Sequence, residues 1–239
     1  MITIILLILG AIALAMYIPE KIRGYTVKAT IMKSVVSVFF IAVAISAGSL
    51  TPLAQFIIMG LVFGLMGDIW LDLKFVFPER DETFTYAGFT TFGIGHILYV
   101  TGMLVQYGAG KFLAVSFALA AVAAAAVLLT EKPMKLVYGK MKPIVFVYGF
   151  LLFSTMFVSG GLLLVHGGTN LLLIFIGSVL FAISDLILSG TYFGEGKDRP
   201  ADIIGNYITY YGGQFLIACS LVFIYLQKKC FHKRIPLLP

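Results

Sequence analysis

The chain has 239 residues, 60% of them hydrophobic and only 12% charged, and its mean hydropathy is +1.03. Soluble domains carry about 25% charged residues, so this composition excludes an ordinary soluble globular protein. Since each membrane-spanning helix takes about 20 apolar residues, the spans use most of the chain, and any activity must be built inside the membrane bundle.

Apolar runs separated by polar breaks predict an all-α, polytopic membrane protein with eight transmembrane helices. We expect the first helix to be retained rather than cleaved as a signal peptide, because no basic residue precedes it. The chain is expected to form one transmembrane domain over 1–239 that ends in a basic C-terminal tail at 227–239. The predicted spans are 2–18, 29–47, 52–73, 86–107, 112–130, 143–165, 170–190 and 203–226.

Basic residues indicate the sides of the membrane. Eleven of them lie in the odd-numbered connections, against five in the even-numbered connections and the tail. The positive-inside rule then places the odd-numbered connections in the cytoplasm and the N-terminus outside, in the plasma (inner) membrane if the protein is bacterial. The tail departs from the rule. Because the net charge of +6 is spread over short connections, it does not indicate a nucleic-acid partner. The eleven basic residues in the odd-numbered connections are Lys21, Arg23, Lys28, Lys74, Arg80, Lys132, Lys135, Lys140, Lys142, Lys197 and Arg199.

Two of the spans resemble each other. Residues 60–71 (GLVFGLMGDIWL) align without gaps with residues 177–188 (GSVLFAISDLIL), and Gly, Val, Asp and Leu coincide. Because these spans are four apart and run in the same direction, they predict a possible parallel repeat of four helices plus four. Chance similarity between two apolar helices is the alternative.

Of the eleven acidic residues, only Asp68, Asp72 and Asp185 fall inside the predicted spans. A carboxylate at membrane depth costs about 2.5–3.5 kcal/mol on insertion scales, so it is expected to face the bundle interior and to be functional. Polar bonds between helices contribute only about 0.6 kcal/mol on average, which does not offset that cost. Asp72 lies one residue before the predicted interface, next to Lys74, and is expected to be solvated.

Further polar side chains are expected near the depth of Asp68 and Asp185, on the same side of the membrane. Their convergence predicts a polar cavity. Each also has a simpler interpretation: a lysine that reaches the interface, tyrosines in an aromatic belt, or a histidine that only packs. These side chains are Lys33, Tyr148, Asn206, Tyr207, Tyr210 and Gln214, with His96 and Tyr99 nearer the middle of the bilayer.

Several sequence signatures of other chemistries are absent. The chain has no phosphate-binding Gly-rich loop, no His-Glu-x-x-His zinc helix and no Gly-x-Ser-x-Gly elbow. His96 and His166 lie at different depths with no third ligand nearby, so we expect no metal and no cofactor. Two neighbouring carboxylic acids, one acting as general acid and the other as base, remain the best chemical candidates.

The ordered set of polar motifs resembles the YhhN family of membrane lysoplasmalogenases. The resemblance covers most of the chain and rests on Gly67-Asp68, Ser184-Asp185 and the segments GFTTFGIGHILY (88–99) and YITYYGGQFLI (207–217), with Lys33 and Tyr148. Asp72 and the acidic loop at 79–82 depart from the pattern.

This resemblance implies an eight-helix hydrolase that cleaves the vinyl-ether bond of lysoplasmalogen. The products would be a fatty aldehyde and glycerophosphoethanolamine or glycerophosphocholine, and membrane lipids would surround the protein. On this hypothesis Asp68 and Asp185 share the acid and base roles in an order left open. Lys33 and the tyrosines of the last span would hold the phosphate, and His96 would orient a water or a carboxylate.

Two alternatives remain open. An intramembrane aspartyl protease also uses two aspartates in its spans, and Met66-Gly67-Asp68 partly matches its Gly-Leu-Gly-Asp motif. The chain lacks that family's Pro-Ala-Leu sequence and has one predicted helix too few. A proton-coupled transporter or lipid-binding protein would also carry acids and repeats inside the membrane.

Overall fold

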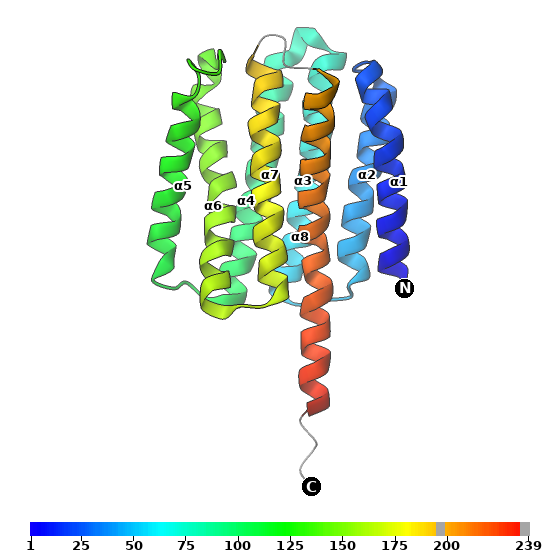
Figure 1. The fold of residues 1–239 in the computed structure, drawn as a ribbon, viewed down its shortest axis with the longest axis vertical. Helices are drawn as coiled ribbons and strands as arrows, with labels where there is room; N and C mark the ends of the chain where they lie inside the picture. Colours follow the sequence, from blue (N-terminus) through cyan, green and yellow to red (C-terminus); the bar gives the residue numbers. More distant parts are fainter. Residues whose placement is uncertain (195–198, 235–239) are drawn as a thin grey trace.

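The computed structural model is a bundle of long helices that run up and down beside one another (Figure 1). It describes the backbone of residues 1–194 and 199–234 and the side chains up to residue 224. The eight long helices are α1 (Ile2–Arg23), α2 (Val27–Ser46), α3 (Pro52–Val76), α4 (Asp81–Tyr107), α5 (Phe112–Leu129), α6 (Lys142–His166), α7 (Thr169–Phe193) and α8 (Pro200–Arg234), with short 3₁₀ helices η1 (Pro78–Arg80) and η2 (Gly139–Met141).

The predicted all-α fold with eight membrane-spanning helices is confirmed, because all eight are long and apolar enough to cross a bilayer. The chain is therefore a multi-pass integral membrane protein. Several helices extend beyond their predicted ends at the side where α3 and α7 finish. Helix α8 continues to Arg234, into the predicted tail, and projects beyond the bundle (Figure 1). Lys197 and the side chains of the tail lie outside the described residues.

Local sequence fixes where two of the helices begin. Thr26 and Thr51 precede α2 and α3, and each side-chain oxygen accepts a hydrogen bond from the backbone N–H three residues later, at 3.1 and 3.2 Å. This is the standard N-cap, which satisfies an otherwise unpaired donor at a helix start. Pro52 occupies the first turn of α3, where a missing N–H does no harm. The caps thereby set the register of the two helices that carry Lys33 and Asp68.

Five helices form a closed ring. In order around it, α3 packs against α4, α4 against α6, α6 against α7, α7 against α8, and α8 against α3. Within the described residues, no Cα atom of α4 lies within 8 Å of a Cα atom of α7 or α8. The middle of the ring is therefore left to side chains. Helix α2 packs outside the ring on α3 and α8, and α5 packs on α6, with α1 and α5 at opposite edges of the bundle (Figure 1).

Two helix pairs in this ring cross at glycines. A Cβ atom added to Gly95 would lie 3.0 Å from the carbonyl oxygen of Gly60, and one added to Gly213 would lie 2.6 Å from that of Gly177. Such close backbone contact needs small residues. The α3–α4 and α7–α8 pairs thus cross in the same way. Gly60 and Gly177, the glycines of α3 and α7 at these crossings, also occupy the same position in the aligned segments. The parallel repeat of four helices plus four stays a prediction, and the shared glycine crossing is consistent with it.

Candidate active site

Asp68 and Asp185 lie at similar depth. Each is eight residues from the end of its helix, α3 or α7, which is about 12 Å along the axis at 1.5 Å per residue. Lys33 and Tyr148 each lie six residues after the start of α2 or α6, at the same end of the bundle. The structure therefore brings these four side chains to nearly one level, as their sequence positions indicate.

A cavity of about 70 Å³ lies at this level, inside the ring of helices. This volume has room for several water molecules. Asp68 and Asp185 both line it, and so do five of the other predicted site residues: Lys33, Tyr148, Asn206, Tyr207 and Tyr210. A cavity is thus present at the predicted depth and carries these polar side chains, although most of its lining is apolar. The aromatic-belt interpretation is wrong for Tyr148, Tyr207 and Tyr210, because all three are buried inside the bundle.

The carboxylate of Asp68 is buried and held by three donors. One oxygen, Oδ1, lies 3.2 Å from the ammonium of Lys33. The other, Oδ2, accepts hydrogen bonds from the Ser37 hydroxyl at 2.6 Å and from the Tyr210 hydroxyl at 2.8 Å. Since one donor is a cation and both oxygens are engaged, these three contacts favour the ionised form of Asp68.

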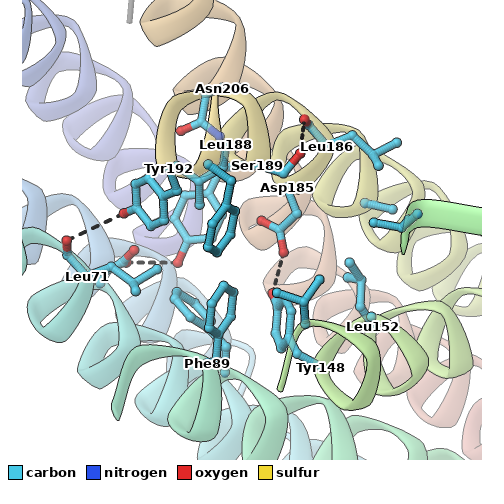
Figure 2. A pocket seen from close by; sticks show the side chains of 18 of the residues that line it. Leu71, Phe89, Tyr148, Leu152, Asp185, Leu186, Leu188, Ser189, Tyr192 and Asn206 are labelled. Atoms are coloured by element: carbon cyan, nitrogen blue, oxygen red, sulfur yellow. Dashed lines mark hydrogen bonds between the residues drawn. The ribbon is translucent and has the colours of Figure 1, made fainter. Parts of the chain in front are cut away.

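Asp185 has a different environment. Its Oδ2 accepts a hydrogen bond from the Tyr148 hydroxyl (Figure 2). Its Oδ1 lies 3.4 Å from the Ser184 hydroxyl. Both neighbours are neutral, and no ion pair involves Asp185 among the described residues. The side chain is only partly buried, whereas Asp68 is 1% exposed. The two carboxyl groups on one cavity therefore differ in charge partner and in access.

Asp72 corrects one expectation, because it is buried at 2% exposure and not solvated. Its Oδ1 lies 2.9 Å from the ammonium of Lys21 and 3.3 Å from that of Lys33. Lys33 is itself 4% exposed, so it does not reach the interface. Lys21, Lys33, Asp68 and Asp72 form a buried cluster of two cations and two anions, which we call the ion cluster.

Replacing Asp72 by asparagine should destabilise the fold by about 3–5 kcal/mol, since it leaves two buried lysines with one carboxylate. Glu20 provides the matched control. It also has two basic partners, Lys28 at 3.0 Å and Arg23 at 3.7 Å, but both are mostly exposed. Glu20→Gln should cost about 1 kcal/mol or less. Unfolding curves in detergent would measure both variants, and equal losses would contradict a buried ion cluster.

Three predicted site residues lie outside the cavity lining. Tyr99 donates to Gln214 at 3.2 Å, and Gln214 donates to the Tyr210 hydroxyl at 3.4 Å. They form a chain behind Tyr210, which in turn bonds Asp68. His96 Nδ1 lies 3.1 Å from the Thr155 hydroxyl, and its Nε2 has no hydrogen-bond partner. The imidazole therefore contacts neither carboxylate, and the expectation that it orients one of them is not met by its contacts.

The side chain of Asn206 forms a hydrogen bond with the backbone of α7. Its amide donates to the carbonyl of Ser184 at 2.7 Å, directly before Asp185 in the chain. It thus fixes α7 against α8 beside the cavity. Among the described residues, no group of three histidine, cysteine or acidic side chains could hold a metal ion.

Ser37, Tyr192 and Tyr211 are site residues that the sequence analysis missed. Ser37 donates to Asp68 and follows Lys33 by one helical turn, a spacing that could have identified it. Tyr211 lies 3.3 Å from the Ser37 hydroxyl and donates to the carbonyl of Lys33 at 3.1 Å. Tyr192 lines the cavity and donates to the carbonyl of Leu71 at 3.4 Å (Figure 2). Because Tyr192 lies beyond the predicted end of its span, it was not among the candidate residues.

Comparison with known proteins gives one match. The model of the YhhN family matches residues 25–221, which include every residue of the predicted site. No curated protein and no solved structure matches the chain. The matched segment covers most of α2 to α8 and therefore the whole ring of helices around the cavity. The chain belongs to the YhhN family.

Proposed function

We propose that this protein hydrolyses the vinyl-ether bond of lysoplasmalogen, with Asp185 as general acid and Asp68 as general base. The observation that carries the proposal is the pair of unlike carboxyl groups on one cavity. Asp68 has the Lys33 cation beside it, whereas Asp185 has only hydroxyl neighbours. Two acids whose surroundings favour opposite protonation states are what acid and base catalysis in one site needs.

In the first step, Asp185 transfers its proton to the alkene carbon farther from the ether oxygen. The double bond supplies the electron pair, and an oxocarbenium ion forms at the carbon bonded to that oxygen. The anionic Asp68 stabilises the developing positive charge across the cavity. A carboxylic acid that is partly accessible and bonded by the neutral Tyr148 is suited to this role.

In the second step, water adds to the oxocarbenium carbon and gives its proton to Asp68, which forms a hemiacetal. The bond from that carbon to the glycerol oxygen then breaks. The protonated Asp68 returns its proton to the leaving oxygen, and Asp185 takes the proton of the hemiacetal hydroxyl. The products are a fatty aldehyde and a glycerophospho-base, one water is consumed, and both carboxyl groups regain their starting states.

Lys33 has a different role in this proposal from the phosphate ligand expected from the sequence. Its ammonium lies 3.2 Å from Asp68 and 3.3 Å from Asp72, so it is already engaged by two carboxylates. It serves as the counter-ion that keeps Asp68 able to act as a base. Tyr210 and Ser37 orient the same carboxylate through their hydrogen bonds.

The deciding experiment incubates purified protein with a lysoplasmalogen, with its saturated ether analogue and with the acyl lysolipid. We expect aldehyde from the first substrate alone, because only a vinyl ether can be protonated on carbon. In D₂O, mass spectrometry should find one deuterium on the carbon next to the aldehyde carbonyl. Cleavage of the acyl lysolipid, or an aldehyde without that deuterium, would contradict the mechanism.

A further inference from the structure

The cavity has two chemically different ends, and Asp185 with Tyr148 lies between them. Polar groups line one end, where Lys33, Asp68 and Tyr207 come from α2, α3 and α8. The other end, which we call the apolar end, is lined from α5, α6 and α7 by Val127, Val145, Leu152, Phe153, Ala182 and Leu186. Figure 2 shows Tyr192 and Leu71 on one side of Asp185, and Leu152 and Leu186 on the other.

The apolar end reaches the outside of the ring of helices. Val127 belongs to α5, which lies outside the ring and packs on α6. Leu186 lines the cavity and is still 40% exposed on the surface of the bundle. Because that surface faces lipid, the apolar end connects the carboxyl groups with the hydrocarbon of the membrane.

We propose that the apolar end binds the single hydrocarbon chain of a lysophospholipid, which enters sideways beside α5, α6 and α7. This inference rests on the proposed function for its choice of substrate class. With the chain in the apolar end and the glycerol toward Lys33 and Asp68, the first chain carbons lie beside Asp185. That position is where the vinyl-ether bond must be for protonation.

Ala182 then determines how much chain the site accepts. Its side chain lines the apolar end and is 4% exposed, one helical turn before Leu186. Phenylalanine at this position would fill room that chain methylenes otherwise occupy. The chain comes from lipid that is as apolar as the site, so the loss is steric and not hydrophobic. Overfilling a packed apolar site costs enough to weaken binding about tenfold.

The test uses a saturated 1-O-alkyl lysophosphocholine with a diazirine in the middle of its chain, which the protein does not need to hydrolyse. After irradiation of the full-length protein in nanodiscs, we expect labelled peptides from the parts of α5, α6 and α7 that carry Val127, Leu152 and Leu186. Excess unlabelled lysolipid should compete. Ala182→Phe should lower the labelling about tenfold by steric exclusion, whereas Ile183→Phe, at the neighbouring position that is 41% exposed, should leave it unchanged.

Leu152→Ala provides a second variant in the opposite direction. It enlarges the apolar end and should raise labelling by a chain with a methyl branch. Labelling spread over the outer surface of α1, or labelling that Ala182→Phe leaves unchanged in a folded protein, would overturn the chain site. Labelling at the expected peptides without any aldehyde from lysoplasmalogen would support the chain site and overturn the proposed hydrolysis.

Discussion

Asp185→Asn should lower kcat for lysoplasmalogen hydrolysis by about 10³-fold, within the range that a general acid contributes. The asparagine amide has nearly the same shape and can still accept the hydrogen bond of Tyr148, but it has no proton to give to carbon. The free energy of unfolding should fall by less than about 1 kcal/mol. The reason is that a neutral amide replaces a neutral carboxylic acid, and both accept the hydrogen bond of Tyr148. Aldehyde release and unfolding in detergent would be measured on the same preparations.

Asp68→Asn gives the contrast that separates the two carboxyl groups. It should also abolish activity, but it removes an anion from beside Lys33 and should destabilise the protein by about 3 kcal/mol. Asp202→Asn, at a carboxylate that pairs with exposed Arg199 at the start of α8, is the surface control and should change neither property. If Asp185→Asn were as destabilising as Asp68→Asn, Asp185 would be the ionised partner, and the assigned roles would be wrong.

Lys33→Met should destabilise the fold about as much as Asp72→Asn does, by about 3–5 kcal/mol. It leaves Asp68 without its cation and Asp72 with Lys21 alone. Either carboxylate can then lower its cost by binding a proton, and a protonated Asp68 cannot act as the base. We therefore expect hydrolysis to be lost even where the variant still folds. Thermal unfolding and a single-turnover assay would measure the two losses separately.

A double-mutant cycle tests whether the loss comes from the unpaired carboxylates. Lys33→Met with Asp72→Asn should be less destabilising than the two single losses added together, because the second change removes one of the anions that the first leaves unpaired. Lys28→Met, at an exposed lysine on the same helix that pairs with Glu20, should cost about 1 kcal/mol or less. Additive losses would mean that Lys33 and Asp72 do not interact.

The fold and the depth of the site could be predicted from the sequence for a simple reason. A bilayer requires long apolar runs, so the spans are visible, and a fixed rise per residue then gives each polar residue a depth. Asp68, Asp185, Lys33 and Tyr148 are at similar depth by that arithmetic, and the structure brings all four to the cavity. Depth is thus a quantity that one sequence can supply.

The direction in which each side chain points around its helix could not be predicted in the same way. In these helices the lipid-facing and interior-facing sides are both apolar, so no periodic pattern indicates where a side chain points. His96 has a depth that allows a place in the cavity, yet it faces Thr155 on α6. Asp72 was misassigned because the neighbouring Lys74 indicated an interface. Its closest partner, Lys21, is 51 residues away on another helix.

The position of the ion cluster has a consequence for how the protein enters the membrane. All four of its members belong to α1, α2 and α3, which leave the ribosome before α4 to α8. Lys21 and Lys33 are therefore synthesised before Asp68 and Asp72, and the charges sum to zero once the third helix is made. A carboxylate or an ammonium that enters lipid alone costs several kcal/mol. Helices α1, α2 and α3 can therefore insert together with the charges of the ion cluster balanced, before the helices that carry Asp185 and Tyr148 exist.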